Sequence, residues 1–144
     1  MKISRRVLGI MLIMGLVATG CNSGPALPKT VTAEGSVTLD GEAVADATVV
    51  FIADTGTYNA TGNTSKDGKF SMRAFQEKTG AVPGSYKVEI NKTIVESKGE
   101  KGGEQVVNLK QGLPKKYATF TTSGLTITIP EGGVKDIKFE LKSK

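Results

Sequence analysis

The 144-residue sequence contains no histidine and no tryptophan, and its single cysteine is Cys21. One cysteine cannot form a disulfide within the chain, and without histidine no Cys/His zinc site can be built. The lack of histidine also excludes a Ser-His-Asp catalytic triad. We therefore expect a protein that is not an enzyme and that needs no cofactor.

Positive charge is concentrated at the N-terminus. The formal net charge is +5, and Lys2, Arg5 and Arg6 supply three of these charges, which leaves +2 for the rest of the chain. The remaining lysines are scattered along the sequence, whereas a nucleic-acid-binding surface needs them clustered on one face. We therefore expect no nucleic-acid partner.

An uncharged run from Val7 to Gly20 follows the basic N-terminus. This run of 14 residues is shorter than the roughly 20 residues that a membrane-spanning helix needs. It is typical of the apolar region of a secretory signal peptide, and it ends in small residues directly before Cys21. The sequence therefore predicts a signal peptide over residues 1–20.

The boundary before Cys21 resembles the lipobox of bacterial lipoproteins, in which the cysteine becomes the lipidated first residue of the mature protein. That family usually carries Leu three positions before the cysteine, where this chain has Ala18. The resemblance implies lipid attachment at Cys21, with acyl chains such as palmitate. Two or more acyl chains hold a protein stably at a bilayer. The alternative is an ordinary signal peptide followed by an incidental free cysteine.

The mature chain divides into a short tether and one domain. Residues 21–29 contain Pro25 and Pro28 and show no hydrophobic period, which predicts a flexible tether. Residues 30–144 are long enough for a single domain with its own core. The Gly-rich, charged segment from Glu96 to Glu104 predicts a mobile loop within this domain.

Short segments with alternating apolar and polar residues fill the domain. No segment of ten or more residues in the domain has a helical period. Asp40-Gly41 and the segment from Lys66 to Lys69 are typical of hairpin turns. The apolar segment Ala47–Ala53 predicts a central strand covered on both faces. Val106 to Leu109 is either a brief strand or one turn. The pattern predicts an all-β domain, a β-sandwich of about seven strands, over Val31–Leu39, Ala47–Ala53, Thr61–Ser65, Phe70–Ala74, Tyr86–Ile90, Leu125–Ile129 and Ile137–Leu141.

Three segments resemble the carboxypeptidase regulatory-like domain: GSVTLDGEAVADATVVF at residues 35–51, TGNTSKDGKFSM at 61–72 and GAVPGSYKVEI at 80–90. Ala43 stands where that family commonly has proline. The family's fold is similar to transthyretin (prealbumin) and to the B-type repeats of collagen adhesins, which implies a Greek-key sandwich. The tail from Leu113 is similar to small lipoproteins of planctomycete-type bacteria.

Two kinds of site receive little support from the residues. The aspartates form no D-x-D-x-D-G calcium loop, and Asp40 and Asp67 are explained as turn residues, so we expect no metal site. The isopeptide bond of adhesin B-type repeats needs an asparagine in the last strand, and residues 137–142 contain none.

Sugar-binding sandwiches usually stack sugars on exposed aromatic side chains, and only 6% of this chain is aromatic. Tyr58 and Tyr117 are the pair that could be exposed and suit a ligand. The alternative for Tyr117 is that it packs back on the sandwich together with Leu113-Pro114. The alternating pattern directs the other strand aromatics toward the core: Phe51, Phe70, Tyr86 and Phe139.

These observations lead to two hypotheses for function. The first is a non-enzymatic lipoprotein of the cell envelope, extracytoplasmic and held at the inner or the outer bacterial membrane by acyl chains on Cys21. It would be a structural or protein-interaction module with envelope proteins as partners. The second is a module that binds glycans or small solutes through loops at one end of the sandwich, using Tyr58 and Tyr117.

Overall fold

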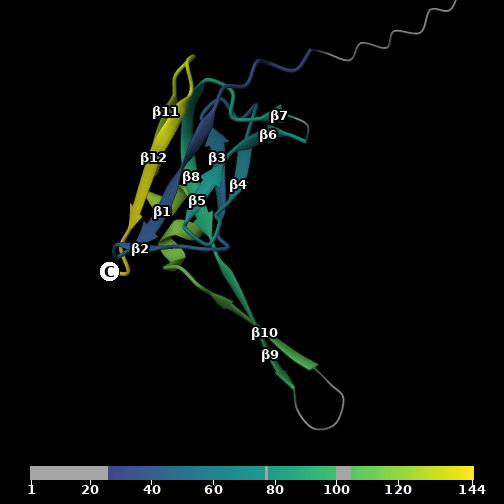
Figure 1. The fold of residues 1–144 in the computed structure, drawn as a ribbon, viewed down its shortest axis with the longest axis vertical. Helices are drawn as coiled ribbons and strands as arrows, with labels where there is room; N and C mark the ends of the chain where they lie inside the picture. Colours follow the sequence, from purple (N-terminus) through teal and green to yellow (C-terminus); the bar gives the residue numbers. More distant parts are fainter. Residues whose placement is uncertain (1–25, 77, 100–104) are drawn as a thin grey trace, which may run out of the picture.

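Extended strands make up most of the chain that the computed structural model describes, which is residues 26–76, 78–99 and 105–144 (Figure 1). This confirms the predicted all-β class. Two short helical turns, η1 (Lys115–Ala118) and α1 (Phe120–Ser123), lie between β10 and β11. The strands in this part of the chain are β1 (Ala33–Leu39), β2 (Glu42–Ala43), β3 (Thr48–Ala53), β4 (Ala60–Asn63), β5 (Lys69–Ser71), β6 (Arg73–Phe75), β7 (Lys78–Thr79), β8 (Gly84–Asn91), β9 (Thr93–Gly99), β10 (Gln105–Gln111), β11 (Leu125–Ile129) and β12 (Val134–Leu141).

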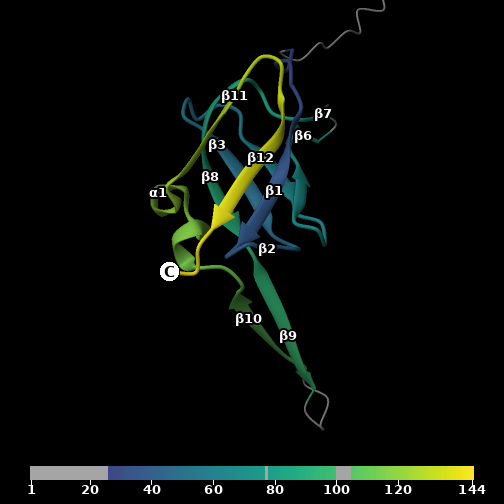
Figure 2. The same ribbon diagram turned by 60° about the vertical axis from the view of Figure 1, so that its left-hand side comes forward.

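The smaller of the two main sheets is built around β1. This strand pairs in parallel with β12, so that Val37 lies opposite Phe139, and it pairs antiparallel with β2 and β5. The register with β12 shifts between Ala33 and Gly35, which marks an irregularity at the start of β1. The first and last strands of the domain therefore lie side by side (Figure 2).

The larger sheet has the strand order β11-β8-β3-β4-β6-β7, and its neighbouring strands are antiparallel. Its middle strand, β3, was predicted to be covered on both faces. Instead, Val49 and Phe51 are buried, whereas Thr48 is exposed and Val50 is half-buried. An antiparallel sheet can leave one face to water, and β3 follows that pattern.

The two sheets pack face to face around one hydrophobic core. In Figure 2, β12 and β1 lie in front of β3 and β8. The ring of Phe51, from the larger sheet, lies 6.3 Å from Phe70 and 6.1 Å from Phe139 of the smaller sheet, and 5.7 Å from Tyr86, measured between ring centroids. The predicted alternation in the last strand is confirmed, because Ile137, Phe139 and Leu141 are all buried.

The Asp40-Gly41 turn forms as predicted and joins β1 to β2. Both residues have positive φ, 51° and 92°, the conformation that primed hairpin turns require. The Asp40 carboxylate accepts a hydrogen bond from the backbone N–H of Ser143 at 3.2 Å, and hydrogen bonding with Ser143 lowers the pKa of Asp40. The turn therefore also holds the C-terminal end of the chain.

The two turns do not join the predicted strands as hairpins, because β1 pairs across the Asp40-Gly41 turn only with the two-residue strand β2. β2 ends at Ala43, and the chain then crosses to the larger sheet, where β3 pairs with β4 and β8. After the turn at Gly68, β5 pairs with β1 of the smaller sheet rather than with β4. β1 and β3 therefore lie in different sheets, and so do β4 and β5.

β9 and β10 form a separate two-stranded sheet, which we call the β9–β10 ribbon. It projects from the domain at the end opposite to that where residues 26–32 enter (Figures 1 and 2). The predicted loop over Glu96–Glu104 is wrong for residues 96–99, which pair with β10, because cross-strand pairing overrides a composition typical of loops. Residues 100–104 lie outside the described residues. Val106–Leu109 is a strand within β10, one of the two predicted possibilities.

The signal peptide, Cys21 and tether residues 22–25 lie outside the described residues. Among the residues that are described, no helix has the length and apolar character that crossing a membrane requires.

Candidate functional site

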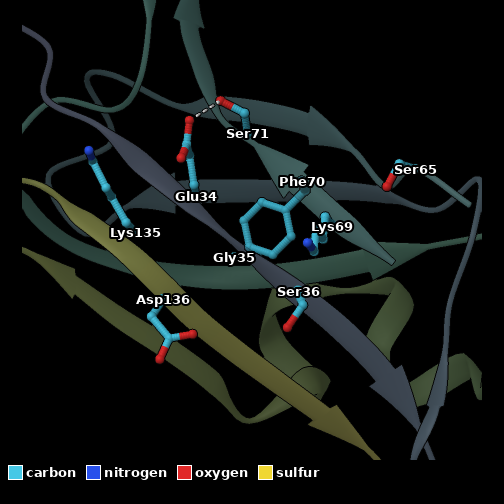
Figure 3. Close-up of a pocket in the computed structure, with 9 residues that line it drawn as sticks. All are labelled: Glu34, Gly35, Ser36, Ser65, Lys69, Phe70, Ser71, Lys135 and Asp136. Atoms are coloured by element: carbon cyan, nitrogen blue, oxygen red, sulfur yellow. Dashed lines mark hydrogen bonds between the residues drawn. The ribbon is translucent and has the colours of Figure 1, made fainter. Parts of the chain in front are cut away.

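An open groove of about 590 Å³ lies on the outer face of the smaller sheet (Figure 3). Alternate residues of a strand point to opposite faces of a sheet, so the residues between the core positions reach this surface. Ser65, from the turn before β5, also lines the groove. The strands supply its polar side chains: Glu34 and Ser36 from β1, Lys69 and Ser71 from β5, and Lys135 and Asp136 from β12.

Gly35 and Phe70 also line the groove, and they lie opposite each other in the β1–β5 pair. Figure 3 shows the Phe70 ring beside Gly35. The ring belongs to the core and is only 4% exposed. The groove therefore offers a ligand little aromatic surface for stacking, and its recognition groups are mostly polar.

Charges of both signs alternate along the groove. The Ser71 hydroxyl donates to Glu34 Oε1 at 3.5 Å, and Lys69 and Lys135 lie on either side of Glu34 (Figure 3). Asp136 pairs with Lys138 at 3.4 Å in water-exposed positions, where an ion pair contributes little to stability. The lining thus carries two positive and two negative side chains and no net charge, which suits a neutral or zwitterionic polar ligand.

The groove holds polar and charged side chains but no histidine, because the chain contains none. Within the described residues, no three His, Cys, Asp or Glu side chains gather closely enough to hold a metal ion. The arrangement can bind a ligand through hydrogen bonds and charges, and the hydroxyl of one of its serines, Ser71, donates a hydrogen bond to the Glu34 carboxylate.

A second hollow, of about 480 Å³, adjoins the groove at Ser71. It lies along β3, β4 and β6, and within it the Thr48 hydroxyl donates to Asn63 Oδ1 at 3.1 Å. Gly62 lies so close to Ser71 that an added Cβ would be 2.7 Å from the Ser71 carbonyl oxygen. Arg73 completes the lining, so this region of surface is polar and carries a positive charge.

The structure separates Tyr58 from Tyr117, the two residues predicted to form an exposed ligand site. Tyr58 is 37% exposed and packs edge-on against Phe75 at 5.9 Å between ring centroids. The pocket beside it measures about 70 Å³ and borders Gly84, the first residue of β8. Ligand pockets typically measure about 300–1,000 Å³, so this one is too small for a sugar.

The prediction that Tyr117 is exposed is wrong, because its side chain is 6% exposed and belongs to the core. Its hydroxyl accepts a hydrogen bond from the backbone N–H of Lys142 at 2.9 Å. The η1 turn that carries it lies near Asn91, the last residue of β8, whose side-chain amide donates to the Ala118 carbonyl at 3.3 Å. The two tyrosines therefore lie near opposite ends of β8 and share no site.

The β9–β10 ribbon is the second surface of interest. Val95 lies directly opposite Leu109, and these side chains are 60% and 69% exposed. The other face of the ribbon carries Glu96 and Lys110, which pair at 2.9 Å. The face with the ion pair also carries Ile94, opposite Lys110 and 40% exposed, so both faces of the ribbon expose apolar side chains.

Sequence reasoning missed both surfaces. Glu34, Ser36 and Ser71 lie within predicted strands, whereas Lys69, Lys135 and Asp136 lie just outside them. The convergence of all six depends on β1, β5 and β12 being neighbours. The ribbon was not predicted, because the glycines and charges of residues 96–104 are typical of a loop. The available signal was the segment TIVES, because Ile94 and Val95 are β-branched residues typical of strands.

No protein-family model matches the chain, and no curated protein matches it. Among solved structures, it is similar to a 9R-lipoxygenase from Cyanothece PCC8801, with a TM-score of 0.34 and 14% sequence identity. The alignment covers 83% of this chain and 18% of the lipoxygenase chain. A similarity this low carries no argument about fold family or activity, so the case for function depends on this chain's own residues.

Proposed function

We propose that the protein is a lipid-anchored, non-enzymatic module of a bacterial cell envelope that acts through protein–protein interaction. The sequence supports the anchor, since a basic N-terminus and a short apolar run lead directly to Cys21. Acyl chains on Cys21 would hold the domain at the membrane, on the extracytoplasmic side. Large exposed apolar side chains commonly mark contact surfaces, and the ribbon presents two of them together.

The observation that carries this proposal is the position of the β9–β10 ribbon. Residues 26–32 enter the domain at one end, and the ribbon projects from the other (Figures 1 and 2). With an anchor at Cys21, the domain lies between the bilayer and the ribbon. The ribbon then displays Val95 and Leu109 away from the membrane, where other envelope proteins can reach them.

We further propose that the domain is a Greek-key sandwich of the carboxypeptidase regulatory-like, transthyretin-like kind. Two packed sheets support this assignment, as does the positive φ of Gly41 and Gly68 at the turns that match the family pattern. A fold of this kind hosts many roles, so it supports the architecture and not a particular activity. An experimental structure with a different strand order would refute the assignment.

The anchor is tested by measuring the intact mass of the full-length protein in membranes from a bacterial host. We expect the mass of residues 21–144 plus acyl groups. A chain with Cys21→Ser should lose both the acyl mass and the processing at this position. An unmodified chain in the soluble fraction would refute the anchored function and indicate a freely secreted domain.

A ligand-binding module is the second candidate function, and the groove of Figure 3 is the observation that favours it. Its volume of about 590 Å³ lies in the range of small-molecule sites, and its lining is polar. A glycan array or solute screen should then detect a ligand whose binding falls when Lys69 and Lys135 are replaced by alanine. Tyr58→Ala is a matched surface control outside the groove. Binding that survives the lysine changes would exclude the groove as its site.

A further inference from the structure

The first and last strands of the domain form a parallel pair that runs between its two ends (Figures 1 and 2). Ala33 of β1 lies opposite Val134 of β12, and Leu39 lies opposite Leu141. Both strands therefore start at one end of the domain and stop at the other. The chain enters β1 from residues 26–32 at the first end and leaves β12 at the second (Figure 2).

β8, which leads into the β9–β10 ribbon, runs in the same direction as this pair. Val31, before β1, and Ala81, before β8, exchange two backbone hydrogen bonds of 2.9 Å, so both strands begin at the same end. At the other end, η1 bonds both to the last residue of β8, Asn91, and to the residue after β12, Lys142. A pull on the ribbon therefore reaches the end of β12 as well as the end of β8.

The direction of a pull decides how a pair of strands separates. Hydrogen bonds cross from one strand to the other, so a force along the strands loads all the bonds of the ladder at the same time. A force that separates the strands from one end loads the bonds one after another. The first geometry, which is shear, therefore resists a larger force, because all the bonds must break together.

We propose that the domain is a load-bearing link, in which the β1–β12 pair resists tension between the membrane anchor and the ribbon. The inference rests on the proposed function, that is, on an anchor at Cys21 and a contact surface on the ribbon. The anchor pulls β1 from its N-terminal end. A protein bound to the ribbon pulls β8 and, through η1, the end of β12. These forces point in opposite directions along the strands, which places the pair in shear.

Backbone contacts extend the β1–β12 pair beyond both of its ends. At the end where the chain enters, the N–H of Val134 donates to the Thr32 carbonyl at 2.7 Å. At the other end, the N–H of Asp40 donates to the Leu141 carbonyl at 2.9 Å, and the Asp40 carboxylate accepts from the N–H of Ser143. Sliding one strand past the other breaks these contacts together with the ladder.

Resistance to force is a different property from thermodynamic stability. Forced unfolding is governed by the rate of unfolding rather than by the free energy of unfolding. One protein can therefore be strong along one direction and weak along another while its stability stays the same. A β1–β12 pair that only stabilised the fold would not produce this dependence on direction.

The test is single-molecule force spectroscopy on the full-length chain with Cys21→Ser, so that the added cysteines are its only thiols. Handles at Ala26→Cys and Lys144→Cys pull the β1–β12 pair along its strands. Handles at Ala26→Cys and Gly132→Cys load the same pair from one end, because the turn before β12 lies beside Thr32. All three handle positions are exposed. We expect a several-fold higher unfolding force for the first handle pair.

A third handle pair, Ala26→Cys with Thr93→Cys, applies the load as a protein bound to the ribbon would. Thr93 is the first residue of β9 and is exposed. We expect an unfolding force close to that of the Lys144 pair. Denaturant unfolding of the three variants is the control, since equal free energies of unfolding assign the difference in force to direction. Glu131→Cys replaces Gly132→Cys if the latter is less stable than the others.

Equal unfolding forces for the Lys144 and Gly132 pairs would overturn the proposal. A Thr93 pair as weak as the Gly132 pair would overturn it as well, because a load on the ribbon would then not place β1 and β12 in shear. Both outcomes leave the anchored interaction function standing. An intact mass of the parent chain without acyl groups would instead refute the anchor and, with it, the source of the load, so the two failures are distinguished by their readouts.

Discussion

Gly35 of β1 lies against Ile137 of β12 so closely that no side chain fits between them. An ideal Cβ at Gly35 would be 2.6 Å from the Ile137 Cβ and closer still to the Ile137 carbonyl oxygen, distances that real Cβ atoms essentially never show. The first and last strands of the domain meet here, and their register shifts just before Gly35. A glycine at this position lets the parallel β1–β12 pair form.

Replacing Gly35 by alanine should therefore destabilise the domain. The clash is with backbone, which cannot move aside as a flexible side chain can, and overpacking typically costs about 1–3 kcal/mol. Denaturant unfolding measures the change. Gly132→Ala is the matched control, because nothing lies within 4 Å of a Cβ at Gly132. Equal stability of the two variants would show that β1 and β12 do not approach this closely.

Phe51→Ala should remove the centre of the core. Phe51 is fully buried and contacts aromatic rings from both sheets, including Phe70 and Phe139. Truncating such a side chain typically costs about 3–5 kcal/mol of unfolding free energy. Phe120, which is 36% exposed, provides a comparison: Phe120→Ala should cost much less. A loss below about 1 kcal/mol for Phe51→Ala would contradict the proposed packing.

The two tyrosines should respond differently to truncation. Tyr117→Ala removes a buried ring and a hydroxyl that holds the backbone of Lys142, so we expect a loss of about 3–5 kcal/mol. Tyr58→Ala should have a clearly smaller effect, because that ring is partly exposed. Thermal and denaturant unfolding test both variants. A Tyr117→Ala protein as stable as the parent would restore the original prediction of an exposed tyrosine.

Stability should fall at alkaline pH because of Tyr86. Burial raises the pKa of the Tyr86 phenol above its usual value of 10.0, and its hydroxyl donates to the Val82 carbonyl. Above about pH 10 the unfolded chain loses this proton while the folded chain keeps it, so the free energy of unfolding decreases as pH rises toward the folded pKa.

Tyr86→Phe removes this group, so its stability should decline less steeply above about pH 10. The variant also loses the hydrogen bond to Val82, which should cost about 0.5–1.5 kcal/mol at neutral pH. Unfolding curves at several pH values compare the two slopes. Parallel declines for parent and variant would show that Tyr86 does not cause the loss of stability at alkaline pH.

Alternation along the chain was a reliable guide to the core. Phe51, Phe70, Tyr86 and Phe139 were each predicted to face the core, and each is buried. The period-two pattern records which face of a strand is apolar, and this property is local. The turn at Asp40-Gly41 was predictable for the same reason, since positive φ is a local requirement met by these residue types.

The arrangement of the strands was not predictable in this way. A short polar segment such as β5 gives no sign of whether it pairs with β4 or with β1, because both choices satisfy its own pattern. Tyr117 lies in a segment without alternation, so its burial depends on packing against the end of β12. The groove of Figure 3 exists only because three strands from distant parts of the chain are neighbours.

The amino-acid sequence alone determines the all-β class, the inward-facing aromatic residues of the strands and the absence of histidine chemistry, because composition and local periodicity carry this information. Folding alone decides that β1 pairs with β12, that Tyr117 is buried, and that Val95 and Leu109 share one exposed face. These features depend on contacts between residues far apart in the chain. The local alternation of apolar and polar residues does not encode such contacts. Several strand pairings satisfy the same alternation, and they differ only in how the whole core packs.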